Sequence, residues 1–241
     1  MNLRYRPIYK KFLPLRGNIQ NRQKLFKFRK IKWKYLLLNL NRVSLNKTRK
    51  NNCYYKFYDQ NIYKILKNKT YFSNKYKQTI LDKRRFKLFY SYLKKSYLKG
   101  LIKKSLKQSD KILNKFSTES IFTSFLENRL DVILVRSHFT LSVRNARQLI
   151  SHKHVFVNKS VVTDCSYTIM PGDLITFSLK SRSLIEYYLI FAEFWPMPPS
   201  NLQISYKLFT IQVLEHSVFS NNSSKFLLWL NLSGVTKSYL K

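Results

Sequence analysis

Basic side chains gather in residues 144–159, where the hydrophobic pattern changes its period. The stretch holds two arginines, two histidines and two lysines: Arg144, Arg147, His152, His154, Lys153 and Lys159. Guanidinium and ammonium groups bind phosphate oxygens, and the Gln and Ser side chains among them can add hydrogen bonds. The histidines lack the paired helical spacing of a metal site, so we expect no metal and no cofactor.

A short helix followed by a hairpin must position these groups. Ser142 is a suitable N-cap, and an apolar face follows it at helical spacing: Val143, Ala146, Leu149 and Ile150. The alternation of Val155 and Val157 predicts a strand, and Asn158-Lys159 predicts a tight turn. We expect the basic side chains to converge where the helix ends and the hairpin begins.

The net charge of the chain indicates a polyanionic partner. The 241 residues hold 46 Lys+Arg and 11 Asp+Glu, a formal charge of +35. Residues 1–116 hold 34 basic and 3 acidic residues, or +31, so the later part is nearly neutral. With 44% hydrophobic residues the chain can still bury a core, unlike a disordered tail. Nucleic acid is the commonest polyanion, and no apolar run is long enough to cross a membrane.

Three regions follow from this distribution: a basic N-terminal region at 1–116, a globular module at 117–180 and a C-terminal segment at 181–241. Residues 1–78 alternate basic and aromatic side chains, which predicts an arm that orders on RNA. Residues 82–107 predict one helix with an aromatic and leucine stripe, in which Gly100 weakens the middle or marks the end.

The module and the tail carry further periodic signals. Leu126, Leu130, Ile133 and Leu134 form a helical stripe, and Leu174 to Phe177 predicts a strand after the turn Pro171-Gly172-Asp173. Later apolar runs suggest short strands. We expect residues 195–206, which include Trp195, to pack against the helix at 82–107, because their charge is low.

At this point several motifs resemble one family, in order and in spacing. They are Arg129-Leu130-Asp131, Arg136, the run from Ala146 to His152, Val157-Asn158 and Pro171-Gly172-Asp173. Together they resemble the S-four RNA-binding domain over about residues 126–177. Residues 82–101 and 198–207 are similar to the flanking parts of small-subunit ribosomal proteins of the S-four family, particularly plant and algal mitochondrial members. The resemblance implies an α+β fold, with a largely helical N-terminal region, two helices on a small sheet, and a tail with short strands.

The resemblance also implies partners and site residues. It implies a structural protein of the mitochondrial small subunit, in the mitochondrial matrix. That protein binds the 5′ domain of the rRNA early in assembly, near the mRNA entrance and beside proteins S-three and S-five. The expected RNA-binding residues are Lys83, Arg84, Arg85, Lys87, Lys94, Lys95, Arg129, Arg136, His138, Ser142, Arg144, Arg147, Gln148, Ser151, His152 and Lys153. The abundance of Lys, Asn, Phe and Tyr also fits an AT-rich organelle genome.

Some features depart from the family. Certain bacterial members hold four zinc-binding cysteines near the N-terminus, whereas this region has only Cys53, so zinc is not expected. Asn128 and Lys159 stand where many members have glycine. The basic N-terminus could also be a mitochondrial presequence, although the lack of acids extends beyond a usual one.

Two other functions compete with the ribosomal one. An RNA-modifying enzyme of the pseudouridine synthase type can carry the same module. However, Glu186, Glu193 and Glu215 lie among apolar runs without a catalytic motif, so we expect no enzyme. A free RNA chaperone is the other alternative, and the long basic arm argues against it. In the ribosomal interpretation Arg144, Arg147 and Lys153 face rRNA, and Arg147→Ala leaves the melting temperature nearly unchanged.

Overall fold

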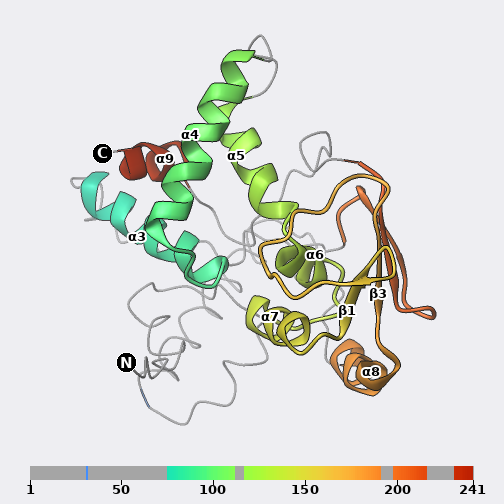
Figure 1. Cartoon of the computed structure of the whole chain (residues 1–241). Helices are drawn as coiled ribbons and strands as arrows, with labels where there is room; N and C mark the ends of the chain where they lie inside the picture. The colour runs from blue at the N-terminus through green and yellow to red at the C-terminus, as the bar shows by residue number, and fades with distance from the viewer. Residues whose placement is uncertain (1–30, 32–74, 112–116, 191–197, 216–230, 241) are drawn as a thin grey trace, which may run out of the picture. The chain divides into compact units, whose positions relative to one another are not determined.

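A computed structural model describes residues 31, 75–111, 117–190, 198–215 and 231–240 (Figure 1). In chain order the elements are α3 (Lys75–Phe89), α4 (Lys95–Lys111), α5 (Thr118–Glu127), α6 (Leu130–Arg136), α7 (Val143–Ser151), β1 (Val155–Val157), β2 (Ser160–Val161), β3 (Leu174–Phe177), η6 (Leu179–Ser181), α8 (Arg182–Ile190), β4 (Leu202–Ser205), β5 (Thr210–Val213) and α9 (Leu232–Leu240). The mixture of helices and one antiparallel sheet confirms the predicted α+β class.

The described residues belong to two compact units. One contains α3 and the beginning of α9, and the other contains α4 to β5 and the end of α9. The predicted arm at 1–78 lies almost entirely outside the described residues, as do Phe194 and Trp195. Within the described ranges no helix is both long and apolar enough to cross a membrane.

The single helix predicted at 82–107 is wrong, because the chain turns between α3 and α4. Ser91 and Tyr92 have φ values of 52° and 58°, in the left-handed region. Each such residue costs about 1–2 kcal/mol relative to right-handed backbone and cannot continue a helix. The expected apolar stripe is still largely buried, since Phe86, Tyr90 and Leu101 are all in the core. Helical period therefore identified the inward side chains but did not reveal the turn.

Gly100 lies inside α4 and is exposed, so it neither ends the helix nor fits a close contact. A Cβ built at Gly100 meets no atom within 4 Å. We expect Gly100→Ala to raise the free energy of unfolding by about 0.5–1 kcal/mol, because alanine loses less backbone entropy in a helix. Urea denaturation measures the change.

Gly172→Ala is the matched control, because Gly172 has a φ of 92° and alanine is strained there. We expect it to lower the stability. A lower urea midpoint for Gly100→Ala would contradict the open environment of this residue.

Two helices rather than one carry the stripe that begins at Leu126. Helix α5 ends at Glu127, Asn128 caps it, and α6 starts after Arg129. Helix α7 begins where expected, since the Ser142 hydroxyl accepts a hydrogen bond from the Asn145 amide at 3.3 Å. Helix α4 packs against α5, and α6 packs against α7.

Five strands form one antiparallel sheet in the order β2-β1-β3-β5-β4. The predicted hairpin is confirmed: β1 pairs with β2, and Asn158 and Lys159 have φ values of 49° and 68°, which a two-residue primed turn requires. The side-chain alternation buries one face of the sheet, including Ile175 and Ile211, and leaves Leu174 and Gln212 on the other.

Helices α6 and α7 cover the buried face, as Figure 1 shows. The core includes Leu130, Leu134, Ala146 and Ile150 from these helices together with residues of β1, β3, β4 and β5. The Phe139 ring lies at its centre and contacts Phe177, with ring centroids 5.0 Å apart. The core therefore fixes the orientation of α7 relative to the hairpin.

The described part of the tail packs back on the protein as expected, but it does so by joining this sheet. β5 pairs with β3, so the sheet crosses the boundary predicted at 180/181. Leu202 is part of the core, and the Tyr206 ring lies 5.4 Å from Phe139. The expected packing of residues 195–206 on the helix at 82–107 is thus replaced, for the described residues 202–206, by strand pairing. Residues 182–190, which suggested a strand, form helix α8, and Ile185 is its buried residue.

Candidate nucleic-acid interface

Helix α7 has one buried face and one polar face. Val143, Ala146, Leu149 and Ile150 are buried against the core. Gln148 and Ser151 are exposed, and Arg144 is half-buried on the turn before them. Because residues four apart share a helix face, Arg144 and Gln148 lie next to each other on the solvent side.

The end of α7 is a left-handed cap built on a lysine. The Lys153 amide donates to the Ile150 carbonyl at 3.0 Å, and the His154 amide donates to the Leu149 carbonyl at 3.0 Å. Lys153 itself has a φ of 62° and is exposed. This pattern is a Schellman motif, whose left-handed position usually holds glycine. A lysine there gives up about 1 kcal/mol of backbone stability and presents an ammonium group at the helix end.

Two histidines flank this cap. The rings of His152 and His154 are nearly parallel, with centroids 6.3 Å apart, and His154 Nδ1 lies 2.9 Å from the Ser178 hydroxyl. His152 is exposed, whereas His154 is half-buried. His152 is thus the histidine of this pair that is presented to a partner, next to Lys153.

The hairpin turn is held by its asparagine. The Leu174 amide donates to Asn158 Oδ1 at 3.0 Å, and Asn158 Nδ2 donates to Asp173 at 2.8 Å. Asn158 therefore ties the turn to the start of β3. Lys159 next to it is exposed and also has a positive φ, so a second cation stands at a position suited to glycine.

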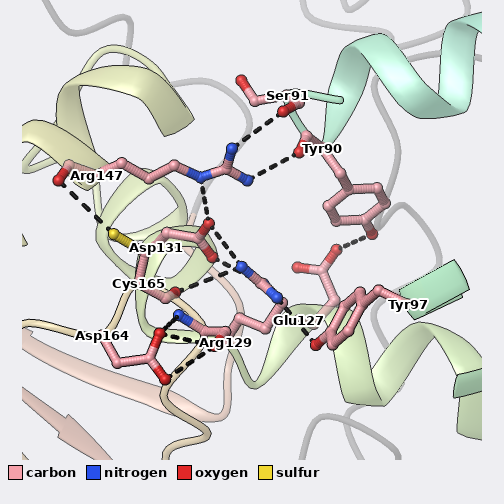
Figure 2. A network of polar contacts seen from close by, with 10 residues as sticks. Tyr90, Ser91, Tyr97, Glu127, Arg129, Asp131, Arg147, Asp164 and Cys165 are labelled. Carbon is pink, nitrogen blue, oxygen red and sulfur yellow. Dashed lines mark hydrogen bonds and ion pairs between the residues drawn. The ribbon is translucent and has the colours of Figure 1, made fainter. Parts of the chain in front are cut away.

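Beneath the polar face lies a buried ion-pair cluster around Asp131 (Figure 2). Asp131 is 0% exposed and accepts from Arg129 Nε at 3.0 Å, Arg129 Nη2 at 3.1 Å and Arg147 Nε at 2.8 Å. Burial alone would lower the pKa of the Arg129 guanidinium, but the hydrogen bond and charge of Asp131 raise it. One carboxylate therefore pairs with both arginines and joins α6 to α7.

Arg147 also reaches the turn before α4, and Arg129 reaches α4 itself. Arg147 donates through Nη1 to the Ser91 carbonyl at 3.0 Å and through Nη2 to the Tyr90 carbonyl at 3.1 Å. Arg129 Nη1 donates to the Tyr97 hydroxyl at 2.9 Å. The cluster consequently ties the α7 helix to the segment that leads into α4, as Figure 2 shows.

A second cluster lies around Glu127. Arg136 donates to both Glu127 oxygens, at 2.8 and 2.9 Å, and the Tyr90 hydroxyl donates to Glu127 at 2.7 Å. Burial, together with the negative charge of Glu127, raises the pKa of Tyr90 well above its usual value. Tyr90 therefore remains a neutral donor that anchors its segment to α5.

The structure divides the predicted site residues into two groups. Four arginines are ion-paired within the protein and at most partly exposed: Arg85 with Asp82, Arg129 and Arg147 with Asp131, and Arg136 with Glu127. The other predicted residues are exposed or half-buried: Lys83, Arg84, Lys87, Lys94, Lys95, His138, Ser142, Arg144, Gln148, Ser151, His152 and Lys153. For both groups, contact with RNA stays a prediction.

Arg147 requires a correction. Its side chain is 28% exposed, and its guanidinium binds Asp131 and two backbone carbonyls. The prediction for Arg147→Ala assumed a solvated arginine, and these contacts contradict that premise. We now expect Arg147→Ala to lower the melting temperature. Loss of the guanidinium would leave Asp131 with one partner fewer and release the Tyr90–Ser91 carbonyls.

The predicted site included Lys95 but not the line of lysines that continues from it along α4. Lys95, Lys99, Lys103 and Lys107 recur every four residues in one helix, with Lys104 beside them. Lys95, Lys103, Lys104 and Lys107 are exposed, and Lys99 is half-buried. The spacing itself was the available signal, because residues four apart are neighbours along a helix face. We call these four residues at spacing four the α4 lysine line.

The residues that carry the polar face of α7 match a known protein family. Residues 128–175 match the family model of the S4 (S-four) domain, which covers α6 to β3. The chain is 35% identical over 118 residues to small ribosomal subunit protein uS4c of Gracilaria tenuistipitata var. liui, covering 47% of this chain and 58% of that protein.

Bacterial and mitochondrial proteins match as well. The uS4B protein of Clostridium acetobutylicum is 32% identical over 114 residues, covering 47% of this chain and 56% of the relative. The uS4m protein of Dictyostelium citrinum is 42% identical over 88 residues, covering 36% and 26%. The chain thus spans about half the length of the first curated relatives, and its similarity to uS4 ribosomal proteins confirms the resemblance seen in the motifs.

Proposed function

We propose that this chain, whose residues 128–175 match the S4 domain, is an RNA-binding structural protein of the mitochondrial small ribosomal subunit. The observation that carries the proposal is the position of the exposed basic end of α7 inside the matched residues. Gln148, Ser151, His152 and Lys153 form one polar surface there, and the net charge of +35 demands a polyanionic partner.

The proposed mechanism is binding without a covalent step. Exposed lysines neutralise phosphates and release counterions, while the rigid helix end and hairpin recognise the shape of a folded RNA. The two buried ion-pair clusters contribute indirectly. The Asp131 cluster fixes α7 relative to the turn before α4, and the Glu127 cluster fixes Tyr90 of that turn to α5. Rigid placement matters because a surface that is already ordered loses less entropy when it binds.

The finer assignments rest on the family resemblance. The chain would bind the 5′ domain of the small-subunit rRNA, early in assembly. It would lie near the mRNA entrance, beside proteins S-three and S-five. The mitochondrial location is supported by the AT-rich codon signature of the composition and by the 42% identity to a uS4m protein. Relatives named uS4c make the plastid the alternative organelle.

Sedimentation tests the ribosomal assignment. We expect the tagged chain from organelle extracts to sediment with the small subunit at low salt and at moderate salt. Removal of Mg²⁺, which dissociates ribosomal subunits and unfolds their RNA, should shift it to lighter fractions. A chain that remains in the light fractions under all conditions would point to the free RNA chaperone. Separate fractionation of mitochondria and plastids decides the organelle.

A substitution at Lys153 tests the binding surface. Lys153→Gly should reduce the salt slope of rRNA binding by about one unit, because one phosphate contact is lost. The same change should raise the free energy of unfolding by up to about 1 kcal/mol, because glycine is favoured at a φ of 62°. The measurements are filter binding to the rRNA at several salt concentrations and thermal unfolding.

Lys153→Arg is the control, since it keeps the charge and should keep the salt slope. In Lys153→Gly the RNA affinity should fall while the stability rises, and unfolding of the variant would lower both. If Lys153→Gly leaves the salt slope unchanged, the cap of α7 is not part of the RNA-binding surface.

A further inference from the structure

The turn between α3 and α4 holds an aromatic residue in an unusual backbone conformation. Ser91 and Tyr92 are consecutive non-glycine residues with φ values of 52° and 58°. A bulky residue seldom adopts this region, because its Cβ approaches the neighbouring carbonyl oxygen. Such a conformation persists only when the surrounding structure holds it, and outliers of this kind gather at ligand-binding sites.

The network around Asp131 and Glu127 holds this turn. Arg147, fixed by Asp131, donates to the carbonyls of Tyr90 and Ser91 at 3.1 and 3.0 Å. The Tyr90 hydroxyl is bound to Glu127 at 2.7 Å, so the residue before the strained pair is anchored at both ends. Figure 2 shows these contacts converging on residues 90 and 91 from α5 and α7.

Tyr92 follows directly after the Ser91 carbonyl that Arg147 of α7 binds, and its side chain reaches the surface. Tyr92 is 38% exposed. Burial raises the pKa of the Tyr92 hydroxyl, and the positive charge of Arg144, which lies one turn before Arg147 on α7, lowers it in part. Lys94 and Lys95, both exposed, follow two and three residues later. A partly exposed aromatic ring therefore lies at a turn that α7 holds, and two exposed lysines follow it in the chain.

We propose that Tyr92 is a stacking platform for an unpaired RNA base, with Arg144 and Lys94 beside it to bind the flanking phosphates. This inference rests on the proposed function, since it assumes that the chain binds RNA. Single-stranded bases stack on exposed aromatic rings whose neighbours are basic, and the contact tolerates any base because every base has a π-face.

Substitutions that separate ring, volume and backbone test the proposal. The full-length chain is titrated with the small-subunit rRNA transcribed from the same organelle genome. Tyr92→Leu should raise Kd by about 5- to 150-fold, the range that the loss of one base–aromatic stack implies. Tyr92→Phe keeps the ring and should retain Kd within about twofold. The salt slope should stay unchanged in both variants, because no charge is removed.

Two further variants control for folding and for general surface effects. Tyr92→Asn suits a left-handed backbone, so it should fold normally and still lose affinity as Tyr92→Leu does. Tyr187→Leu removes a tyrosine that is 56% exposed on α8, outside the turn between α3 and α4, and should leave Kd unchanged. Melting temperatures verify that each variant is folded.

The outcomes separate this inference from the function on which it rests. A wild-type chain that does not bind the rRNA overturns both. If the wild type binds the rRNA but Tyr92→Leu and Tyr92→Asn keep Kd within twofold of it, the stacking role alone is overturned. A loss in Tyr92→Phe equal to that in Tyr92→Leu also overturns it, because the hydroxyl would then carry the contact. A fall in salt slope for Tyr92→Leu would show disruption of the phosphate contacts instead of lost stacking, and would count against the proposal.

Discussion

Asp131→Asn should lower the free energy of unfolding by about 3–5 kcal/mol, the range seen when one partner of a buried ion pair is removed. The carboxylate is fully buried and accepts hydrogen bonds from Arg129 and Arg147. Asparagine preserves the shape but removes the charge, so two guanidinium groups would remain next to each other without a counter-ion. Because Arg147 also holds the Tyr90–Ser91 carbonyls, the loss should extend to the turn before α4.

The measurement is urea or thermal unfolding of the purified chain. Asp164→Asn is the matched control, since Asp164 is exposed and accepts its hydrogen bonds from Ser166 nearby. A surface change of this kind usually alters stability by about 0.5 kcal/mol or less. A loss in Asp131→Asn no larger than in the control would mean that the two arginines are stabilised by solvent, contrary to their burial.

Replacement of the α4 lysine line by glutamine, at Lys95, Lys99, Lys103 and Lys107, should reduce the salt slope of rRNA binding by about three to four units. Between 50 and 200 mM salt the wild type should then lose about 100-fold more affinity than the variant. Like charges four residues apart repel each other along a helix, and Asp110 is the only acidic residue in α4. A helix of this composition is stabilised when phosphates neutralise it.

The same variant should be more stable than the wild type in the absence of RNA, because glutamine removes the repulsion and remains a good helix former. Replacement of all four lysines by arginine keeps the charge and serves as the control. Binding with an unchanged salt slope in the glutamine variant would show that α4 faces protein or solvent instead. Circular dichroism and thermal unfolding measure the stability change.

The local features of the module could be predicted from the sequence because short-range chemistry determines them. The N-cap at Ser142 needs only its own hydroxyl and the amide of Asn145. The turn at Asn158-Lys159 needs two residues that adopt positive φ, and asparagine does so readily. The apolar residues of α7 recur three or four positions apart, and this spacing identified its buried side. Ala146 and Ile150, for example, lie on one face of the helix.

The role of Arg147 could not be predicted in this way. Its spacing from Arg144 placed it on the polar side, which is correct as far as the helix alone is concerned. Its partners, however, are Asp131 on another helix and the carbonyls of Tyr90 and Ser91 more than fifty residues earlier. Hydrophobic period contains no information about such distant polar contacts. An arginine next to a buried aspartate in three dimensions looks the same in the sequence as one that binds phosphate.

The turn at Ser91 and Tyr92 escaped prediction for a related reason. Serine and tyrosine give no signal for left-handed backbone, and the apolar stripe continues across them with helical spacing. The energy that holds the turn comes from outside the segment, through Arg147. Likewise, the extension of the sheet by β4 and β5 depends on pairing between Ile175 and Ile211, which local propensity does not reveal.

The strand order has a consequence for synthesis of the chain. β3 lies at the centre of the sheet, between β1, which precedes it, and β5, which is made much later. While translation proceeds, the module can form α6, α7 and the first hairpin, but the far edge of β3 stays open until residue 213 has left the exit tunnel. An open edge can pair with another nascent chain, which is a common route to aggregation. Chains truncated between residues 177 and 210 would therefore expose an edge of β3 that can aggregate, whereas chains that extend past residue 213 can pair that edge with β5.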